Sequence, residues 1–242
     1  MKILVYSPRF DDLIIKEQIK LGTENSCYYY NHKGGIARIL NGEYSSIIPS
    51  LIDVINITTK KSIILLGSDK KTTITERIPS VSLKETNNNN YKVVLFSYAE
   101  DINWSDSYFK NFSSTTVLVD LSGRYKKFNQ ILKLLETVNR DFMEIIIFLT
   151  EHDPMHKKIC QEVKKLNIKI IFHTPQEIVY YGKNKIIKVE NKYYKYFERD
   201  FVGYGDYIAL LTCQQLSKNL PLNNNFFETC QELIRMNIDE QI

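Results

Sequence analysis

Short apolar runs recur along this chain, and its second half also contains longer segments in which apolar positions repeat with a helical period. The apolar runs predict buried strands, and the amphipathic segments predict helices. The predicted strands are 2–7, 62–67, 92–97, 116–120, 144–149 and 168–173, and the predicted helices are about 127–138, 155–166, 205–218 and 226–236. Because strands and helices alternate, we expect an α/β domain in which helices cover a largely parallel sheet.

Two stretches depart from this alternation. Residues 178–197 contain three short apolar runs close together, which predict successive strands and an antiparallel extension of the sheet. Residues 41–90 offer only two strands, at 62–67 and 72–78. We therefore expect little regular structure in that part of the chain.

The composition agrees with one globular domain. At 242 residues with 43% hydrophobic residues, the chain can bury a sizeable core, so we expect a single domain over 1–242. The formal net charge is only +4, and basic residues are scattered among acidic ones. Binding to nucleic acid is therefore not indicated.

The cysteines and the N-terminal residues bear on the compartment. Cys27, Cys160, Cys213 and Cys230 lie far apart without paired spacing, which favours reduced, mostly buried thiols over a disulfide or zinc framework. The N-terminal residues predict a strand rather than a signal peptide. No apolar run approaches the roughly 18 to 20 residues that a membrane-spanning helix needs. We expect a cytoplasmic protein that does not enter a membrane.

The segment 200–206, Asp-Phe-Val-Gly-Tyr-Gly-Asp, leads directly into the apolar stretch 207–211. Two glycines allow a turn to bring backbone N–H groups close to an anion, and a helix that starts there adds the positive end of its dipole. Asp206 would stand at the start of that helix, where a carboxylate can accept a proton from a hydroxyl while the amides hold a phosphoryl group. The alternative is an ordinary strand-to-helix turn in which Asp206 only caps the helix.

This segment resembles the second signature of the PfkB (ribokinase-like) carbohydrate kinase family, Asp-Thr-x-Gly-Ala-Gly-Asp. The matching positions are Asp200, Gly203, Gly205 and Asp206. Phe201 replaces the family's Thr, and Tyr204 replaces a residue that is nearly always small. The resemblance implies a three-layer α/β/α domain in which Asp206 is the catalytic base and Gly203, Tyr204 and Gly205 form the anion hole.

The resemblance extends to the N-terminal half and is weakest over residues 25–90. The strand at 116–120 continues as Asp-Leu-Ser-Gly-Arg, which resembles the family's strand ending in Asp-x-Asn-x-Arg with Ser122 in place of Asn. Asp12 and Leu13 resemble the family's sugar-facing Asp-Leu pair, and the pair at 34–35 resembles its first glycine signature. The implied substrate-binding residues are Asp12, Gly34, Gly35 and Arg38. Arg38 would favour an acidic or phosphorylated substrate.

The family carries Asn-x-x-Glu after the strand that corresponds to 144–149, where it helps to organise magnesium and phosphate. Thr150 and Asp153 stand at the aligned positions here. The resemblance implies ATP and Mg²⁺ as cofactors, with Thr150, Asp153 and Thr174 near the nucleotide and no direct protein ligand to the metal, since magnesium usually keeps several waters. A transition metal could be bound by His152, Asp153 and His156 only if the helix already began at these residues. The cluster also lacks a third strong ligand. A structural role is favoured for them.

In the PfkB family, the segment between the Asp-Leu pair and the glycine pair belongs to a small β-sheet lid over the sugar, which is often also a dimer contact. This chain is short where the lid should continue, so we expect a reduced or missing lid. A homodimer is the partner that the resemblance implies. The tyrosines at 28–30 and 193–194 fit sugar stacking or an interface, but strand packing alone also explains them.

Two function classes remain. The first is an ATP-dependent phosphotransferase that acts on a hydroxyl of a sugar or sugar-like compound, with Asp206 as the base. The second is a catalytically inactive PfkB-like protein that keeps the fold as a binding or assembly module, favoured by Phe201, Tyr204 and the lost amide at Thr150. A dinucleotide-binding Rossmann enzyme is disfavoured because the first strand is followed by Pro8-Arg9-Phe10 and not by a glycine-rich turn.

Overall fold

The computed structural model describes residues 2–19, 25–33, 46–66, 71–77, 91–97, 116–121, 136, 144–150, 156–166, 168–174, 176–192 and 204–239. The strands are β1 (Lys2–Ile19), β2 (Asn25–Lys33), β3 (Ile52–Leu66), β4 (Lys71–Arg77), β5 (Tyr91–Phe96), β6 (Thr116–Asp120), β7 (Glu144–Thr150), β8 (Lys169–His173), β9 (Glu177–Tyr181) and β10 (Ile186–Glu190). The helices are the 3-10 turn η1 (Pro49–Leu51), α3 (His156–Lys165), α5 (Tyr204–Ser217) and α6 (Asn224–Asp239).

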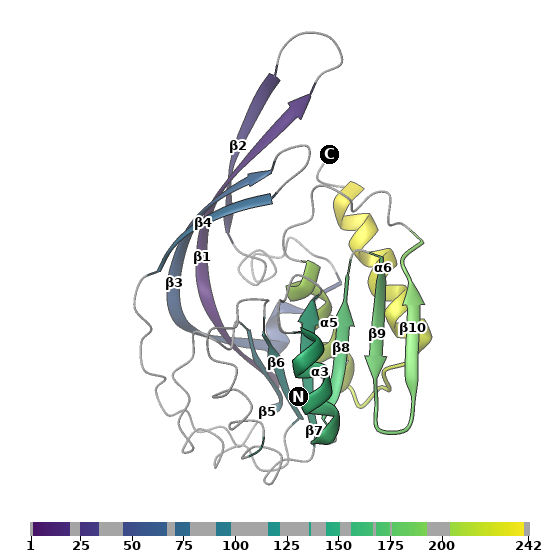
Figure 1. The fold of residues 1–242 in the computed structure, drawn as a ribbon. Helices are drawn as coiled ribbons and strands as arrows, with labels where there is room; N and C mark the ends of the chain where they lie inside the picture. The colour runs from purple at the N-terminus through teal and green to yellow at the C-terminus, as the bar shows by residue number, and fades with distance from the viewer. Residues whose placement is uncertain are drawn as a thin grey trace.

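The described strands form one ten-stranded sheet in the order β10-β9-β8-β7-β6-β5-β1-β3-β4, with β2 paired to β1 (Figure 1). Neighbours from β8 to β3 run parallel, whereas β9, β10, β2 and β4 join antiparallel. The prediction of a largely parallel sheet with an antiparallel extension after residue 178 is confirmed for β9 and β10. The predicted strand at 193–197 lies outside the described residues.

Strand β1 belongs to two parts of the sheet. Its first half, up to Tyr6, lies between β5 and β3. In its second half, 11–16 lies between β2 and β3, and 17–19 pairs with β2. The register against β3 shifts between Ser7 and Arg9, at Pro8, which has no N–H to donate to a ladder. Beyond this point, β1 leaves the central sheet together with β2, β3 and β4 as a four-stranded extension (Figure 1).

This extension corrects our expectation for residues 41–90. We predicted only two short strands and a reduced or missing lid, but β3 starts at Ile52 and runs for 15 residues, and β2 adds a further strand at 25–33. A four-stranded extension is therefore present where we expected few strands. The strand prediction missed this part of β3 because stretches such as Thr58–Lys61 are polar, and their strand conformation comes with pairing to the second half of β1.

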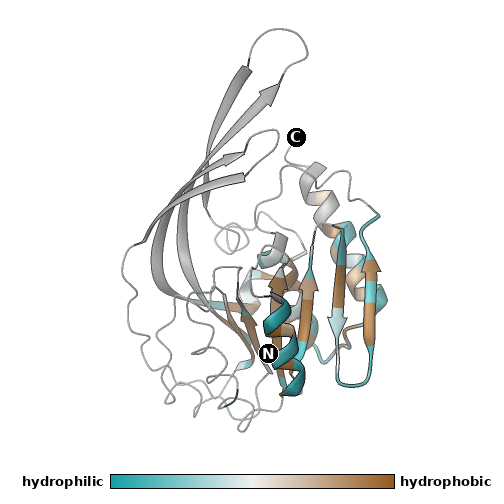
Figure 2. Cartoon of the chain, in the orientation of Figure 1, coloured by the Kyte–Doolittle hydropathy of each residue, from teal (hydrophilic) through white to brown (hydrophobic). Residues whose placement is uncertain are grey.

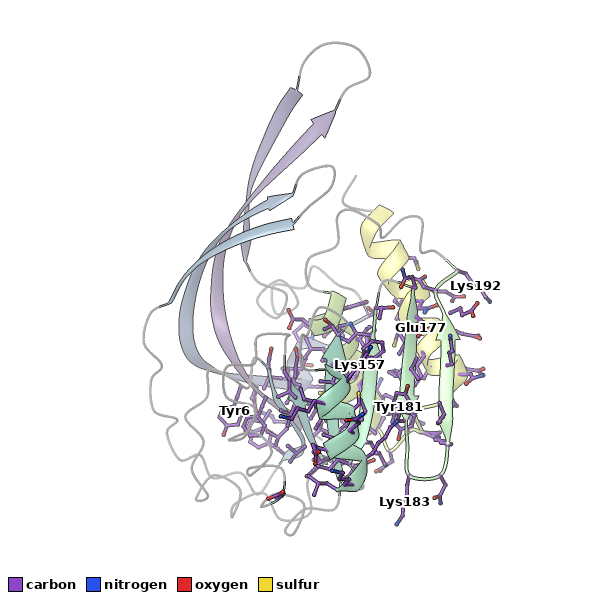
Figure 3. All side chains as sticks on the ribbon, in the orientation of Figure 1. Tyr6, Lys157, Glu177, Tyr181, Lys183 and Lys192 are labelled. Atoms are coloured by element: carbon purple, nitrogen blue, oxygen red, sulfur yellow. The ribbon has the colours of Figure 1, made fainter. Side chains whose placement is uncertain are left out.

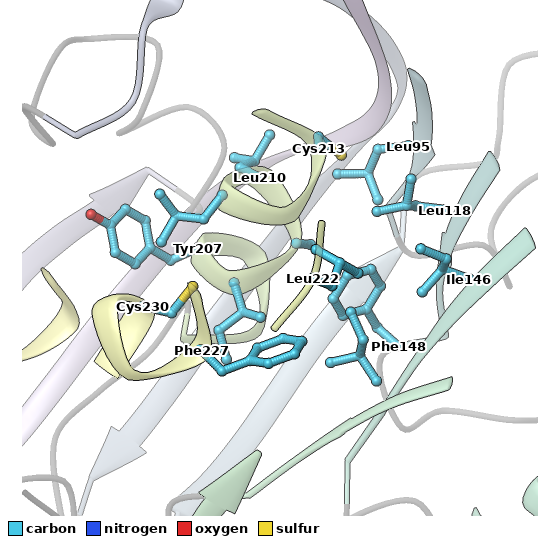
Figure 4. Close-up of a cluster of buried hydrophobic side chains, with 14 of the residues drawn as sticks. Leu95, Leu118, Ile146, Phe148, Tyr207, Leu210, Cys213, Leu222, Phe227 and Cys230 are labelled. Atoms are coloured by element: carbon cyan, nitrogen blue, oxygen red, sulfur yellow. The ribbon is translucent and has the colours of Figure 1, made fainter. Parts of the chain in front are cut away.

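The central strands are buried on both faces, as expected for parallel strands between helix layers. Every side chain from Val93 to Phe96, and likewise from Ile145 to Leu149, is buried. Odd-numbered residues of β5 join a core with α5 and α6, and even-numbered ones join a second core with α3. Figure 4 shows the first core, in which Leu95, Leu118, Ile146 and Phe148 face the two helices. The structure is thus the three-layer α/β/α domain that was predicted.

The helices differ in how deeply they are buried. Helix α3 is amphipathic and shows a hydrophilic outer face (Figure 2), with Ile159 and Val163 buried against the sheet. Helix α5 is buried from Asp206 to Cys213 because α6 covers it on its outer side. The predicted helices at 155–166, 205–218 and 226–236 are confirmed with ends that differ by at most three residues. Of 127–138, only Glu136 is described, and it is helical. None of the described helices is long and apolar enough to span a membrane.

Candidate functional site

The carboxyl ends of the parallel strands bring several polar residues to one edge of the sheet. Ser97 directly follows β5, Asp120 ends β6, Thr150 ends β7 and His173 ends β8. The strand register places Asp120 opposite Phe148, and Thr150 opposite His173, so these positions lie close to the same level. In open α/β sheets, ligands bind at this edge.

Helix α5 begins at the same edge. Asp206 lies in its first turn with 8% of its surface exposed, and Ser97 is 1% exposed. The Ser97 hydroxyl donates a hydrogen bond to Oδ1 of Asp206 at 3.4 Å, across 109 residues of sequence. Ser97 is itself held by its backbone N–H, which donates to the carbonyl of Tyr6 at 2.9 Å. The edge of the sheet therefore fixes one oxygen of a buried carboxylate.

Gly205 precedes this carboxylate and packs against His173. A Cβ atom on Gly205 would lie 3.0 Å from Cε1 and 3.1 Å from Nε2 of the His173 ring. The absence of a side chain thus lets α5 start directly beside the end of β8. His173 is buried, so the ring forms part of the wall beneath the first turn of α5.

Thr174 organises the connection from β8 to β9. Its Oγ1 accepts hydrogen bonds from the backbone N–H groups of Gln176 and Glu177, each at 3.1 Å. Its own N–H donates to the carbonyl of Glu177 at 2.9 Å. The residue is buried and builds a tight turn at the same edge as Asp206.

The outer side of α5 is tied to the segment before η1. The hydroxyls of Tyr207 and Ser46 are hydrogen-bonded to each other. Gln214 donates to the Ser46 carbonyl at 3.1 Å and accepts from the N–H of Ile48 at 3.1 Å. Helix α5 is therefore anchored both to the sheet and to the chain that leads into β3.

Solved structures of similar fold identify this arrangement. A ribokinase from Cryptococcus neoformans var. grubii in complex with ADP superposes with a TM-score of 0.60 at 13% identity, over 95% of this chain and 91% of that one. The Burkholderia thailandensis nucleoside kinase in complex with inosine gives a TM-score of 0.57 at 8% identity, covering 96% and 89%. The Arabidopsis thaliana ribokinase complexed with ribose and ATP gives 0.52 at 12% identity, covering 95% and 88%.

The chain has a ribokinase-like fold. No protein-family model matches the sequence, and no curated protein is significantly similar to it. The likeness thus rests on the arrangement of strands and helices over nearly the whole chain, and at these identities it shows the fold alone.

Within the ribokinase-like fold, several predicted site residues come together. Tyr204, Gly205 and Asp206 form the start of α5, and Thr150 and Thr174 follow the ends of two neighbouring strands at the same edge. Asp12 lies in the extension, paired with His32 of β2 and Ser62 of β3. Since β1 runs parallel to β5 and continues past Tyr6, the extension leaves the sheet at the edge that carries Asp206. The predicted residues Gly203, Gly34, Gly35, Arg38 and Asp153 lie outside the described residues.

The sequence reading did not single out Ser97 or His173 as site residues. Each directly ends a run of buried strand residues, and this position is the signal that would have found them, because the ends of parallel strands meet at one edge. The pattern of apolar residues does not show that α5 returns to this edge and begins between Ser97 and His173.

The donor set at this edge suits a phosphate better than a tightly held metal. The first N–H groups of α5 lack intrahelical partners and point towards the edge, as in anion sites at helix N-termini. No group of three His, Cys, Asp or Glu side chains that could hold a metal ion occurs among the described residues. Two buried carboxylates, Asp120 and Asp206, do lie at the edge. This set fits magnesium bound mainly by phosphates and water.

Proposed function

We propose that this protein transfers the terminal phosphoryl group of ATP to a hydroxyl of a sugar or sugar-like compound. The observation that carries the proposal is the buried carboxylate of Asp206 in the first turn of α5, held by Ser97 at the carboxyl edge of a ribokinase-like sheet. Solved proteins with this fold include a ribokinase complexed with ribose and ATP and a nucleoside kinase in complex with inosine.

Asp206 is the general base of the proposed reaction. It accepts the proton of the attacking hydroxyl as the oxygen–phosphorus bond forms and the bond to the ADP leaving group breaks. Ser97 donates to Oδ1 and thereby helps to orient the carboxylate. The protein chain needs no covalent intermediate for this step.

The start of α5 is the proposed anion hole. The backbone amides of Gly203, Tyr204 and Gly205, with the positive end of the helix dipole, stabilise the charge on the transferring phosphoryl group. Thr150 and Thr174 lie on the proposed nucleotide side. Thr174 acts there through the turn that it organises, because its hydroxyl oxygen already accepts two backbone hydrogen bonds.

Magnesium, when bound with ATP, neutralises charge between the nucleotide phosphates. Thr150 and Asp153 are proposed to act on it through its waters, not as direct ligands. The sugar is proposed to lie between the start of α5 and the extension, with Asp12, Gly34, Gly35 and Arg38 as its binding residues. A homodimer formed through the extension and a cytoplasmic location remain predictions.

One observation favours the second candidate, a catalytically inactive module of the same fold. His173 covers Gly205 closely enough that packing alone explains the glycine. In addition, Tyr204 stands where the PfkB signature has a small residue, and its ring would compete for space with the γ-phosphate if it faced the anion hole. Under this alternative, the fold is kept without nucleotide binding.

The two candidates separate in a binding and turnover experiment with the purified full chain. Calorimetric titration with Mg²⁺ and ATP or ADP measures nucleotide binding, and ADP release measures turnover over a panel of sugars and nucleosides that includes ribose and inosine. Saturable nucleotide binding together with substrate-dependent ADP release supports the kinase. Absence of both supports the inactive module.

If the wild-type protein binds no nucleotide, Tyr204→Ala tests whether this side chain is the reason. If the Tyr204 side chain blocks the phosphate site, removing it should restore nucleotide binding, because the backbone amides and the helix dipole remain. Phe226→Ala, at the other end of the α5–α6 pair, serves as a control of similar size change away from the site. Failure of Tyr204→Ala to restore binding would assign the loss to the rest of the site.

A further inference from the structure

A cavity of about 450 Å³ lies at the opposite, amino-terminal edge of the sheet. Its lining comes from the starts of β7 and β8, the turn of the β9–β10 hairpin and the connection from α5 to α6. Figure 1 shows that the hairpin turn lies at the end of the molecule away from the arrowheads of β7 and β8. The volume falls within the range of small-molecule sites, and the proposed kinase site does not use this cavity.

One wall of the cavity is apolar. It consists of Tyr180, Leu216, Pro221 and Leu222. Tyr180 is fixed by its neighbours, since its ring centroid lies 5.9 Å from that of Phe227 and the residue is buried. Tyr180 thus supports the wall from behind, and the partly exposed Leu216 and the exposed Pro221 provide its accessible apolar surface.

The rest of the lining is predominantly cationic. Three lysines, Lys169, Lys183 and Lys185, face one acid, Glu144, so the lining carries an excess of two positive charges. Lys169 forms an ion pair with Glu144, which leaves the excess on Lys183 and Lys185. Both of these residues belong to the hairpin turn, where Lys183 is exposed at the tip (Figure 3).

The hairpin turn holds Lys185 over the apolar wall. The N–H of Gly182 donates to the Lys185 carbonyl at 2.8 Å, and the Lys185 ammonium donates to the Leu222 carbonyl at 2.9 Å. This bond uses one of the three donors of the ammonium group. The same Nζ lies 5.7 Å from the centroid of the Tyr180 ring. A cation is thus positioned directly beside an aromatic surface.

The turn depends on a glycine to reach this position. A Cβ on Gly182 would lie 3.0 Å from Cε1 of Tyr180 and 3.3 Å from Cγ of Lys185. The chain therefore passes close over the ring, and the lysine side chain follows it. The cationic and apolar parts of the cavity lining are therefore in contact with each other.

We propose that this cavity binds a small organic anion with a flat aromatic body, such as an aryl phosphate. Its anionic group pairs with Lys183 and Lys185, and its ring packs against Leu216 and Pro221, which keep accessible surface in the apolar wall. Neither part alone would suffice, because exposed lysines bind a simple anion weakly and an open apolar wall holds a neutral ring weakly. The proposal does not depend on phosphoryl transfer.

Calorimetric titration of the full chain with phenyl phosphate tests the proposal, with inorganic phosphate and phenol as probes that carry only one of the two features. We expect saturable binding of phenyl phosphate and at least about tenfold weaker binding of each single-feature probe. No saturable binding of phenyl phosphate at millimolar concentration, or equal binding of inorganic phosphate or of phenol, overturns the ligand class.

Two variants locate the site. Lys185→Gln should weaken the binding of phenyl phosphate about tenfold. Because it also removes the bond to Leu222, Lys183→Glu at the exposed turn provides a variant that leaves the packing intact and should weaken binding in the same direction. Lys157→Gln, an exposed lysine of α3 outside this lining, is the matched control and should bind as the wild type does. Wild-type affinity in both hairpin variants would place the bound molecule elsewhere and refute the site.

Discussion

The carboxyl edge and the amino edge of the sheet differ in their charged side chains. At the carboxyl edge, the buried charged side chains of the described residues are the carboxylates of Asp120 and Asp206. The amino edge carries lysines, and its acids are paired: Asp53 with Lys2, and Glu144 with Lys169. The first edge thus buries carboxylates, whereas the second joins neighbouring strands through pairs of acids and lysines.

Helix α5 explains part of this difference. Its N-terminus lies at the carboxyl edge, where the helix dipole favours a negative group such as Asp206. Its C-terminus lies at the amino edge, where the negative end of the helix dipole favours cations. There Lys92 donates to the Ser217 carbonyl at 3.4 Å and also bonds to Asn219, which has a φ of 60° and ends the helix. The dipole of this one helix therefore favours acidic side chains at one edge of the sheet and lysines at the other.

The largest expected effect is on activity, and it should differ between carboxylates of the two edges. Asp206→Asn should lower kcat by about 10² to 10⁴, because the amide keeps the size of the carboxylate but cannot accept the proton. Nucleotide affinity should change little, since the backbone amides hold the phosphates. Asp53→Asn, a carboxylate of the amino edge, should leave kcat unchanged. Steady-state kinetics of both variants check this contrast, and equal losses would contradict it.

The next effect concerns stability at the amino edge. Burial by itself would lower the pKa of the Lys169 ammonium, but the hydrogen bond and charge of Glu144 outweigh it, so this pKa is raised. Lys169→Met should lower the free energy of unfolding by about 1.5 to 3 kcal/mol, because it leaves a partly buried Glu144 without its cation. Lys157→Met is the matched control, and urea denaturation measures both.

The pH dependence of the same pair has a definite sign. Because the folded pKa of Lys169 is raised, the stabilisation is complete below the unfolded value of about 10.4 and is lost as the pH rises through the folded value. As the pH rises from neutral, the difference in unfolding free energy between wild type and Lys169→Met should therefore begin to shrink above about pH 10.4. A difference that shrinks near neutral pH would show that the pair is not its source.

A smaller effect tests the packing beneath the first turn of α5. Gly205→Ala should force the His173 ring to move, although alanine favours a helix by up to about 1 kcal/mol over glycine. In the His173→Ala background this steric cost disappears. A double-mutant cycle should therefore give a coupling free energy of about 0.5 to 3 kcal/mol. Additive changes would mean that the ring does not restrict residue 205.

The smallest effect is an acid-dependent one at Asp53. Hydrogen bonds from Lys2 and then Tyr91 hold the pKa of the Asp53 carboxyl below its ordinary value. A lowered pKa stabilises the fold above the unfolded value of about 3.9, and this contribution is lost as the pH falls through the folded value. Because the pair is solvent-exposed, Asp53→Asn should cost less than about 1 kcal/mol at neutral pH. Thermal denaturation at pH 7 and below pH 3 should show the difference only at pH 7.

The sequence predicted the elements that are buried on both faces. Strands such as Glu144–Thr150 consist of consecutive apolar residues, and helix α5 follows a turn signature that is visible in the sequence. The two buried thiols of Cys213 and Cys230 are free, as their spacing indicated, and burial raises their pKa. The second half of β1 could not be predicted, because Arg9, Asp11 and Asp12 give no apolar signal.

The amino-acid sequence by itself determined the α/β class, the helix that carries Asp206 and the chemistry open to that residue, because these depend on local periodicity and on residue type. Only the tertiary structure decided that Ser97 and Asp206 meet across 109 residues, that His173 covers Gly205, and that β1 continues into a four-stranded extension. Such contacts depend on strand order and on the return of α5 to one edge of the sheet. Neither the strand order nor the position of α5 produces a periodic pattern in the amino-acid sequence.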